Sequence, residues 1–298
     1  MQVSQLHVGS GFVRGGLTVF PVWTATVVAG RGYVPAARAS LEIREQAGSP
    51  SVGDLVVFNP GPRPALVLDG DLLEGGWQHR VANRSVLVPA QESLALDVSC
   101  VEAGRWGGDV THRTGRRRAP LGVRPALGNL HRADMPTAGR TDQGEVWRRV
   151  GGYEQRHDSS GTHSLLEATA HAEEAARGLV ADVAPLPGQA GVLLGIGGYP
   201  AALELFDSPR TLREVWSSLL LGAAVDSLSS PAVPTPSRRA RRLAEELTGS
   251  GLQPETRAGL GTTATGHTEH LATRALLWRQ HAVHLFTLDR RHPLALAV

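Results

Sequence analysis

Residues 54–69 read DLVVFNPGPRPALVLD, and the strand pattern of the chain is clearest here. Two apolar runs, Asp54 to Asn59 and Ala65 to Asp69, flank a spacer that contains three prolines. Proline fixes φ and has no backbone N–H to donate to a sheet, so the spacer cannot continue either strand. The pattern predicts two strands joined by a hairpin or by a tight connection.

Short strands are predicted on both sides of this stretch. From Leu94 to Val101 apolar residues recur at every second position, which is typical of a half-buried strand. Further apolar runs lie at Gly16 to Val28, which Pro21 interrupts, and at 41–44 and 86–88. Repeated short strands with Pro/Gly turns predict an antiparallel sandwich or barrel-like half over residues 1–110.

The composition changes after this half. From Arg105 to Arg140, eight arginines stand against two aspartates, and the apolar periodicity is lost. Residues 111–140 are therefore expected to form a basic connection that is exposed or partly mobile.

Residues 141–298 carry helix signals and a few strand signals. Helices are expected to start at Asp142, Ser164 and Ser208, each a residue that caps helices, and Pro209 suits the first helical position. A strand pair is expected within 191–206, a further helix at 238–248, and strands at 261–265, 275–278 and 283–288. The expected fold is α+β: the β-rich half packs on a C-terminal half of helices plus a small antiparallel sheet.

The composition excludes several kinds of chemistry. Apolar residues make up 41% of the 298, enough for a sizeable core and unlike a disordered chain. The single cysteine excludes an intrachain disulfide and a cysteine-rich zinc site. All 30 basic residues are arginine, which excludes a Schiff-base lysine, a lysine general base and a phosphate-binding lysine of the Walker type.

Charge and hydropathy give the expected location. The formal net charge is +2, which is weak evidence for a nucleic-acid partner. The first residues lack the charged start and apolar core of a signal peptide, and the longest apolar run, around 219–225, is far too short for a membrane span. We expect a soluble, cytoplasmic protein with no membrane partner.

The densest polar cluster outside the basic stretch lies at 69–80, DGDLLEGGWQHR, after a predicted strand. Its glycines allow a ligand to approach the backbone closely. Glu74, Gln78 and Arg80 could serve acid–base chemistry, bind a metal ion or hold a polar small molecule. The alternative is a hairpin with solvated charges.

A second cluster, at 99–106, also leaves a strand and enters a turn. Glu102 and Arg105 could pair with each other, or both could face a shared pocket with Trp106 as a stacking wall. Cys100 lies on the apolar face of its strand, so we expect an inert buried thiol rather than a nucleophile.

Other polar residues give weaker signals. His267, Glu269 and His270 could bind zinc or manganese if residues 267–270 curve as a turn, although most histidines are structural or exposed. The arginine runs at 116–118 and 238–242 could grip phosphate, but no aromatic residues interleave with them. Most such runs are solvated faces.

Several blocks, in this order, resemble a known family: VVFNPGPRPALVLDGDLLEGGWQHR, SVLVPA, VSCVEAGRW, TDQGEVW, GYPAALELFDSPRTLREVWSSLL and AVHLFTL. The family is the ARG-and-rhodanese-phosphatase-superfamily-associated protein domain, a bacterial group without an established reaction. In its pattern Glu74, Gln78 and Arg80 fill the first loop, whereas Trp77 and His79 depart from the usual lysine and asparagine. Glu102, Arg105 and Trp106 fit the second block. The resemblance implies a role in nucleotide or ADP-ribose metabolism.

Together these features favour a site that binds or processes a phosphorylated, nucleotide-like small molecule. In this hypothesis Glu74 and Glu102 are the catalytic carboxylates, and the substrate is held by Gln78, Arg80, Arg105 and Trp106. If the protein is a hydrolase, a divalent metal is expected, because no lysine offsets the phosphate charge. The hypothesis requires that two turns about thirty positions apart fold side by side.

Two other function classes remain open from the sequence. One is a non-catalytic protein-interaction module, in which the same residues form a buried polar network that fixes a hairpin and the exposed arginines recruit a partner, with a homo-oligomer as one possibility. The other is a nucleic-acid-associated protein that uses exposed arginines, above all Arg116, Arg117 and Arg118.

Overall fold

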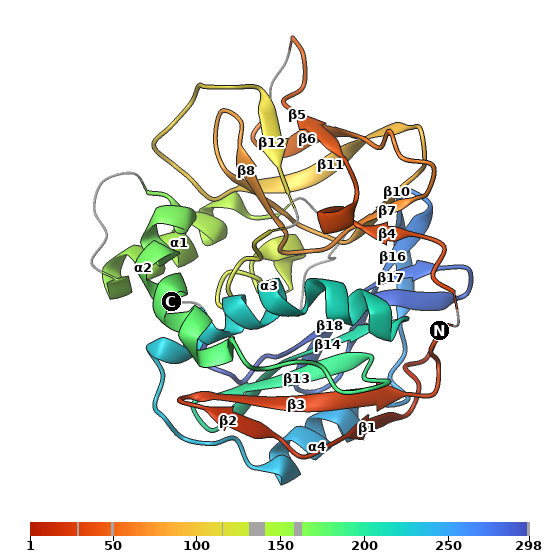
Figure 1. Ribbon diagram of the computed structural model, residues 1–298, viewed down its shortest axis with the longest axis vertical. Helices are drawn as coiled ribbons and strands as arrows, with labels where there is room; N and C mark the ends of the chain where they lie inside the picture. Colours follow the sequence, from red (N-terminus) through yellow and green to blue (C-terminus); the bar gives the residue numbers. More distant parts are fainter. Residues whose placement is uncertain (29, 49–50, 115, 131–140, 158–162, 297–298) are drawn as a thin grey trace.

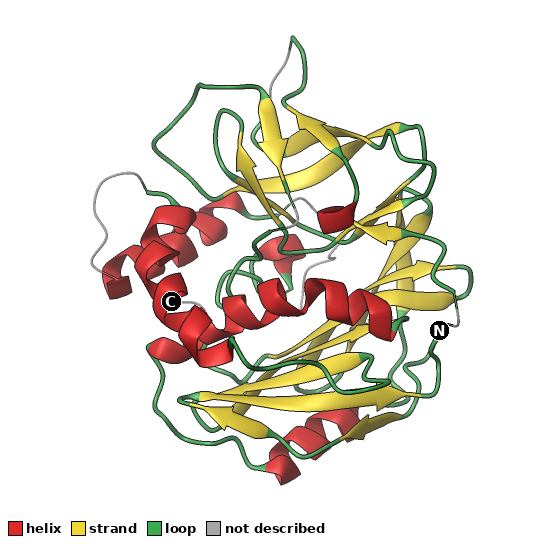
Figure 2. Ribbon diagram, viewed as in Figure 1, coloured by secondary structure: helices red, strands yellow, loops and turns green. Residues whose placement is uncertain are grey.

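The computed structural model describes residues 1–28, 30–48, 51–114, 116–130, 141–157 and 163–296. Figure 1 shows a large sheet at one end of the molecule, a smaller β-structure at the other, and helix α3 (Pro209–Leu228) lying between them. Figure 2 shows that helix and strand are spread over the whole molecule. The α+β class expected from the sequence is confirmed.

Within the described residues, nine antiparallel strands form the large sheet in the order β1-β3-β13-β14-β18-β17-β16-β15, with β2 also paired to β3. The bounds are β1 Leu6–Val8, β2 Phe12–Arg14, β3 Leu17–Thr24, β13 Gly191–Ile196, β14 Tyr199–Phe206, β15 Gln253–Ala258, β16 Gly261–His267, β17 Leu271–Trp278 and β18 His281–Asp289. The first strands of the chain therefore pair with strands of its C-terminal half, through β3 and β13. The division at 1–110, 111–140 and 141–298 stays a prediction.

Pro21 lies inside β3, although the sequence pattern predicts an interruption there. Its carbonyl accepts a hydrogen bond from the Gly9 N–H at 2.9 Å. In an antiparallel strand the N–H and C=O of one residue point to the same neighbour, so the missing donor faces β1 and β2 rather than β13. Because β2 pairs with residues 17–19 and β1 with residues 22–24, Pro21 falls between the two ladders and disrupts neither.

The expected barrel-like half is also confirmed. In the described part of the chain, a closed barrel runs β11-β6-β5-β12-β8-β9, beside a three-stranded sheet β10-β7-β4. The bounds are β4 Val34–Pro35, β5 Glu42–Arg44, β6 Asp54–Phe58, β7 Ala65–Val67, β8 Leu72–Gly75, β9 Arg80–Ala82, β10 Val86–Val88, β11 Ser93–Cys100 and β12 Thr111–Arg113. Since β6 and β7 belong to different sheets, the proline spacer is a tight connection and the hairpin alternative is wrong.

The helices begin where the capping signals predict. Helix α1 (Gln143–His157) starts after Asp142, whose Oδ1 accepts from the N–H groups of Gly144 and Glu145 at 3.0 and 3.3 Å. Helix α3 starts after Ser208, whose Oγ accepts from the N–H of Arg210. Helix α2 (Leu165–Val180) follows Ser164 without a side-chain cap bond. The remaining helices are α4 (Ser237–Leu247) and the short 3₁₀ turns η1 (Ala36–Arg38) and η2 (Leu127–Asn129).

The central strands of the large sheet are buried on both faces. Val19 and Leu194 point into the core shared with α3 and the barrel, whereas their neighbours Phe20 and Leu193 point into the core under α4. This alternation is the period-two rule applied to two central strands. Figure 1 shows α4 on the face of the sheet opposite α3.

The expectation of an exposed basic connection is wrong for residues 119–130, which are all buried. Leu121, Val123 and Leu127 lie in successive turns, so apolar residues are buried there without a helical or strand period. Residues 131–140 lie outside the described residues. Among the described helices, none has the length and apolar character needed to span a membrane.

Candidate functional site

The two loops that the sequence hypothesis requires to be neighbours do lie side by side. The loop between β8 and β9 contributes Gln78, whose Nε2 donates to the carbonyl of Glu102 at 2.8 Å, and His79, whose N–H donates to Glu102 Oε2 at 2.8 Å. The loop after β11 contributes Arg105, whose Nη1 donates to the carbonyl of Gly76 at 2.6 Å. These bonds join turns that are distant in sequence at one end of the barrel.

We call residues 76–79 and 101–106 the loop junction. Most of the charged side chains in and beside it pair with one another. Arg105 grips Glu102 with two bonds, Nε to Oε1 at 2.9 Å and Nη2 to Oε2 at 2.8 Å. Burial pushes the pKa of Glu102 upward, but the bonds from Arg105 and from the His79 backbone hold it below its ordinary value. Arg80 is fully buried, donates to Gln78 Oε1 at 3.0 Å, and lies under the Trp106 ring.

Glu74 has a different neighbour from Glu102. Its Oε1 lies 3.7 Å from Nε of Arg117, which also lies 3.5 Å from Oε2 of Glu173. Trp106 is 53% exposed and meets Trp77 edge to face, so an aromatic wall is present at the rim of the junction. The catalytic roles of Glu74 and Glu102 stay predictions.

The structure contains a charged cluster that the sequence analysis missed. Two carboxylates and three guanidinium groups meet in the interior between the barrel and the large sheet. They belong to Asp69 after β7, Arg118 and Arg124 after β12, Glu204 in β14 and Arg274 in β17. We call them the buried ion network.

Each carboxylate oxygen of the buried ion network faces a guanidinium group. Asp69 accepts from Arg124 at 2.7 Å and from Arg274 at 2.5 Å, and Glu204 accepts from Arg118 at 2.7 Å and from Arg124. Burial alone would raise the pKa of both carboxyl groups, but the arginines hold both values well below the ordinary range. The network is ionic at neutral pH and ties the barrel side to the sheet.

Among the described residues, one set of side chains has the spacing of a metal site: Asp69, Glu204 and His284. All four carboxylate oxygens already accept from arginine, and three guanidinium groups repel a cation, so the donor set does not fit a divalent metal. His284 instead shares a 2.8 Å hydrogen bond between Nδ1 and Ser85 Oγ. Among the described residues, His267, Glu269 and His270 are not brought to ligand spacing, and a metal site there stays a prediction.

Part of the buried ion network had a sequence signal. Glu204 in AALELF and Arg274 in LATRALLW are single charges inside apolar strands, and a buried charge requires a partner. Arg118 gave a misleading signal, because a run of three arginines is typical of a solvated face. The structure buries Arg118 and pairs Arg117, so the expected exposed run at 116–118 is wrong for Arg118.

Asp71, beside the buried ion network, gives a pH prediction. Burial raises its pKa to about 6, against the attraction of Arg118. A carboxyl group whose pKa is raised in the folded state stabilises the fold below its unfolded pKa and loses that stabilisation as the pH rises through 6. We therefore expect the free energy of unfolding of Asp71→Asn, relative to that of the wild type, to rise by roughly 2–3 kcal/mol as the pH increases from 4 to 7. Urea titrations at several pH values measure this difference. A constant difference between the two proteins across that range would contradict the assignment.

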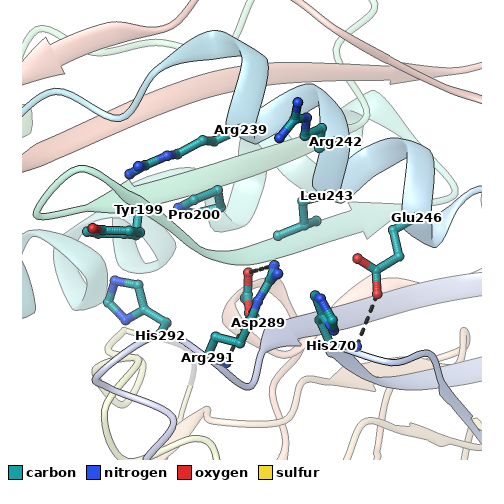
Figure 3. A pocket seen from close by; sticks show the side chains of 10 residues that line it. All are labelled: Tyr199, Pro200, Arg239, Arg242, Leu243, Glu246, His270, Asp289, Arg291 and His292. Carbon is teal, nitrogen blue, oxygen red and sulfur yellow. Dashed lines mark hydrogen bonds and ion pairs between the residues drawn. The ribbon is translucent and has the colours of Figure 1, made fainter.

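A cavity of about 480 Å³ lies where α4 covers the start of β14 and the end of β18. Figure 3 shows Leu243 and Glu246 reaching from α4 toward Asp289 and His270, whereas the Arg242 side chain extends away from them. The residues that line the cavity are Tyr199, Pro200, Arg239, Arg242, Leu243, Glu246, His270, Asp289, Arg291 and His292. The volume is in the range of small-molecule sites, and we call it the α4 cavity.

The charged residues of the α4 cavity differ in how far they are engaged. Arg291 binds Asp289 through two bonds of 2.9 and 2.8 Å, and Arg239 donates to the Gly198 carbonyl at 2.7 Å. Glu246 accepts from the N–H of His270 at 3.1 Å. Arg242 is exposed and makes no hydrogen bond or ion pair with any described residue. The cavity therefore keeps one guanidinium group ready for a ligand.

His292 is not available for proton transfer in this cavity. Its Nδ1 accepts from the N–H of Leu294 at 3.2 Å, so its Nε2 carries the proton and donates to the Ile196 carbonyl at 3.1 Å. Burial lowers the pKa of His292, which agrees with a neutral ring. The α4 cavity is thus equipped for binding rather than for acid–base chemistry at this histidine.

Comparison with known proteins gives one match. Residues 5–288 match the model of a family described as the ARG and Rhodanese-Phosphatase-superfamily-associated Protein domain. Neither a curated protein nor a solved structure matches the chain. The match covers almost the whole chain, including the loop junction, whereas Asp289, Arg291 and His292 of the α4 cavity lie beyond its end.

Proposed function

The chain belongs to the ARG and Rhodanese-Phosphatase-superfamily-associated Protein domain family, and we propose that it binds a phosphorylated small molecule in the α4 cavity. The observation that carries the proposal is Arg242, which has no partner within the described chain and lines a cavity of about 480 Å³. In a chain without lysine, guanidinium groups are the permanently charged side chains that can bind a phosphate.

The α4 cavity supports binding better than the loop junction. At the loop junction both oxygens of Glu102 and both bonding edges of Arg105 are already engaged within the protein. A ligand that binds at the loop junction would have to break these hydrogen bonds. A ligand that binds in the α4 cavity breaks none at Arg242, because Arg242 has no partner there to lose. Hydrolysis by Glu74 and Glu102 with a divalent metal stays a separate prediction, as does a connection to ADP-ribose.

Arg242→Ala is expected to weaken binding of ribose 5-phosphate by about ten- to a hundredfold, because a charge-assisted hydrogen bond contributes roughly 1.5–3 kcal/mol. Isothermal titration calorimetry at low salt measures the change. The matched control is Arg241→Ala, since Arg241 is next to it on α4 but faces a separate groove beside β1. That variant is expected to bind as the wild type does.

Two results would overturn the location or the function. If Arg105→Ala abolishes binding and Arg242→Ala does not, the ligand binds at the loop junction. If the wild type binds neither ribose 5-phosphate nor inorganic phosphate at millimolar concentration, the proposed function fails.

A further inference from the structure

We infer that the free edge of strand β1 binds an extended peptide segment of a partner protein, which adds to the large sheet as a further strand. The segment carries an acidic residue and, two positions later, a basic residue. A groove of about 530 Å³ lies between residues 5–10 and helix α4, and we call it the β1 groove. Figure 1 shows α4 beside β1. This inference goes beyond the proposed function, which concerns the other side of α4.

The backbone of β1 has hydrogen-bonding groups that no described residue uses. Within the described sheet β1 is an end strand and pairs with β3. The N–H of Gly9, just after β1, donates to the carbonyl of Pro21 in β3 at 2.9 Å. Because successive residues of a strand direct their backbone groups to opposite sides, His7 also faces β3, whereas Leu6 and Val8 face away from it. The N–H and C=O groups of Leu6 and Val8 have no partner among the described residues and are available to a further strand.

The opposite edge of the large sheet is less suited to such pairing. Strand β15 contains Pro254, and its register with β16 is irregular between Pro254 and Arg257. Proline and bulges are means by which edge strands avoid pairing with other chains. Strand β1 has neither feature, so β1 is the edge that can accept a strand.

Helix α4 forms the second wall of the β1 groove. The helical residues that line the groove share one face of α4 and are Arg241, Ala244, Glu245 and Thr248. On the strand side, Leu6 and Val8 pack into the core under α4. Residues directly opposite each other in an antiparallel pair lie on the same face of a sheet. A peptide residue that bonds to the backbone of Leu6 or Val8 therefore also directs its side chain toward α4.

The charges on α4 determine which peptide side chains fit. Arg241 and Glu245 are exposed, and neither makes an ion pair with any described residue. Residues four apart on a helix are separated by about 6 Å along its axis, and residues two apart on a strand by about 6.8 Å. An acidic and a basic residue two positions apart can therefore face Arg241 and Glu245 at the same time.

The direction of α4 gives the order of the two charges. Gly249, just after α4, donates to the carbonyl of Val3 at 2.9 Å, so α4 ends near the residues that lead into β1. Helix and strand thus run in opposite directions. A peptide that continues the antiparallel pairing of the sheet runs in the direction of α4 and meets Arg241 before Glu245. The acidic residue therefore precedes the basic one.

Fluorescence anisotropy with a labelled, end-capped heptapeptide, Ser-Thr-Glu-Val-Arg-Thr-Ser, tests the inference. The same peptide with Glu and Arg exchanged is expected to bind about five- to tenfold more weakly, because both charges then face like charges. The double variant Arg241→Glu/Glu245→Arg should reverse this preference, and both positions are exposed, so the fold tolerates the exchange. Arg238→Ala is the matched control, since Arg238 is exposed on α4 and lines neither the β1 groove nor the α4 cavity.

Backbone methylation of the peptide tests whether it binds as a strand. An N-methyl group on the Glu or on the Arg of the peptide removes a donor to β1 and is expected to weaken binding about tenfold. An N-methyl group on the Val between them should leave binding unchanged, because that N–H points away from β1.

Three results would overturn the inference, and none of them bears on phosphate binding in the α4 cavity. The first is that neither peptide binds to the folded wild type at millimolar concentration. The second is that the two peptides bind equally well, or that all three methylated peptides lose the same affinity. The third is that the wild type sediments as a dimer and binds no peptide, in which case a second copy of the chain occupies the edge of β1.

Discussion

Glu204→Gln is expected to lower the free energy of unfolding by about 3–5 kcal/mol, because it removes one member of a buried ion network and leaves charge without a partner. Glu204 is fully buried and accepts from both Arg118 and Arg124. The amide of glutamine is nearly isosteric, so the loss reports charge and hydrogen bonding rather than volume. Urea denaturation at pH 7, followed by tryptophan fluorescence, measures it.

A surface substitution of the same chemistry provides the control. Glu42 pairs with Arg44 on β5, where both side chains are about half exposed, and Glu42→Gln is expected to change stability by less than about 1 kcal/mol. The double variant Glu204→Gln/Arg118→Gln should lose less than the sum of the two single variants, because each removes the other's unpaired charge. If Glu204→Gln lowers the free energy of unfolding as little as the control does, then Arg118 and Arg124 do not require a carboxylate at position 204.

The features that the sequence predicted correctly depend on residues close together in the chain. Asp142 and Ser208 with Pro209 specify helix starts through atoms within one turn, so α1 and α3 begin where expected. The alternation from Leu94 to Val101 reflects a strand with one buried face, and β11 confirms it. The shared position of the two loops was a requirement of the hypothesis and not a local prediction; it arises because the end of β11 pairs with the start of β9.

The features that the sequence did not predict depend on distant pairs. Nothing near β3 specifies that its partner is β13, some 170 residues later, or that the gap between β1 and β2 accommodates Pro21. In the same way Arg118, Glu204 and Arg274 form one network only after the barrel and the sheet have met. The α4 cavity was missed because Arg242 and Tyr199 are far apart in sequence, although the arginine run at 238–242 was noted as able to grip phosphate.

Gly259→Ala is expected to destabilise the protein by about 3 kcal/mol or more, because the position combines backbone strain with a steric overlap. Gly259 has φ +63° in the turn between β15 and β16, and an added Cβ would overlap the carbonyl oxygen of Leu87 in β10. That oxygen accepts from the N–H of Leu260 at 2.9 Å, so the turn is held against the three-stranded sheet. The substitution therefore forces the β15–β16 turn of the large sheet away from β10 of the three-stranded sheet, at a point where the two sheets meet.

Gly15→Ala separates the two parts of this effect. Gly15 has φ +58°, nearly the same as Gly259, but an added Cβ would meet no atom within 4 Å. It should cost only the strain of a left-handed residue, about 1 kcal/mol, whereas Gly259→Ala should cost clearly more by the same urea titration. Equal losses of stability would mean that the backbone at Leu87 moves aside at little cost. The turn at Gly259 would then not hold the large sheet against the three-stranded sheet. A larger loss at Gly259 assigns the difference to that contact, since φ is nearly the same at the two glycines.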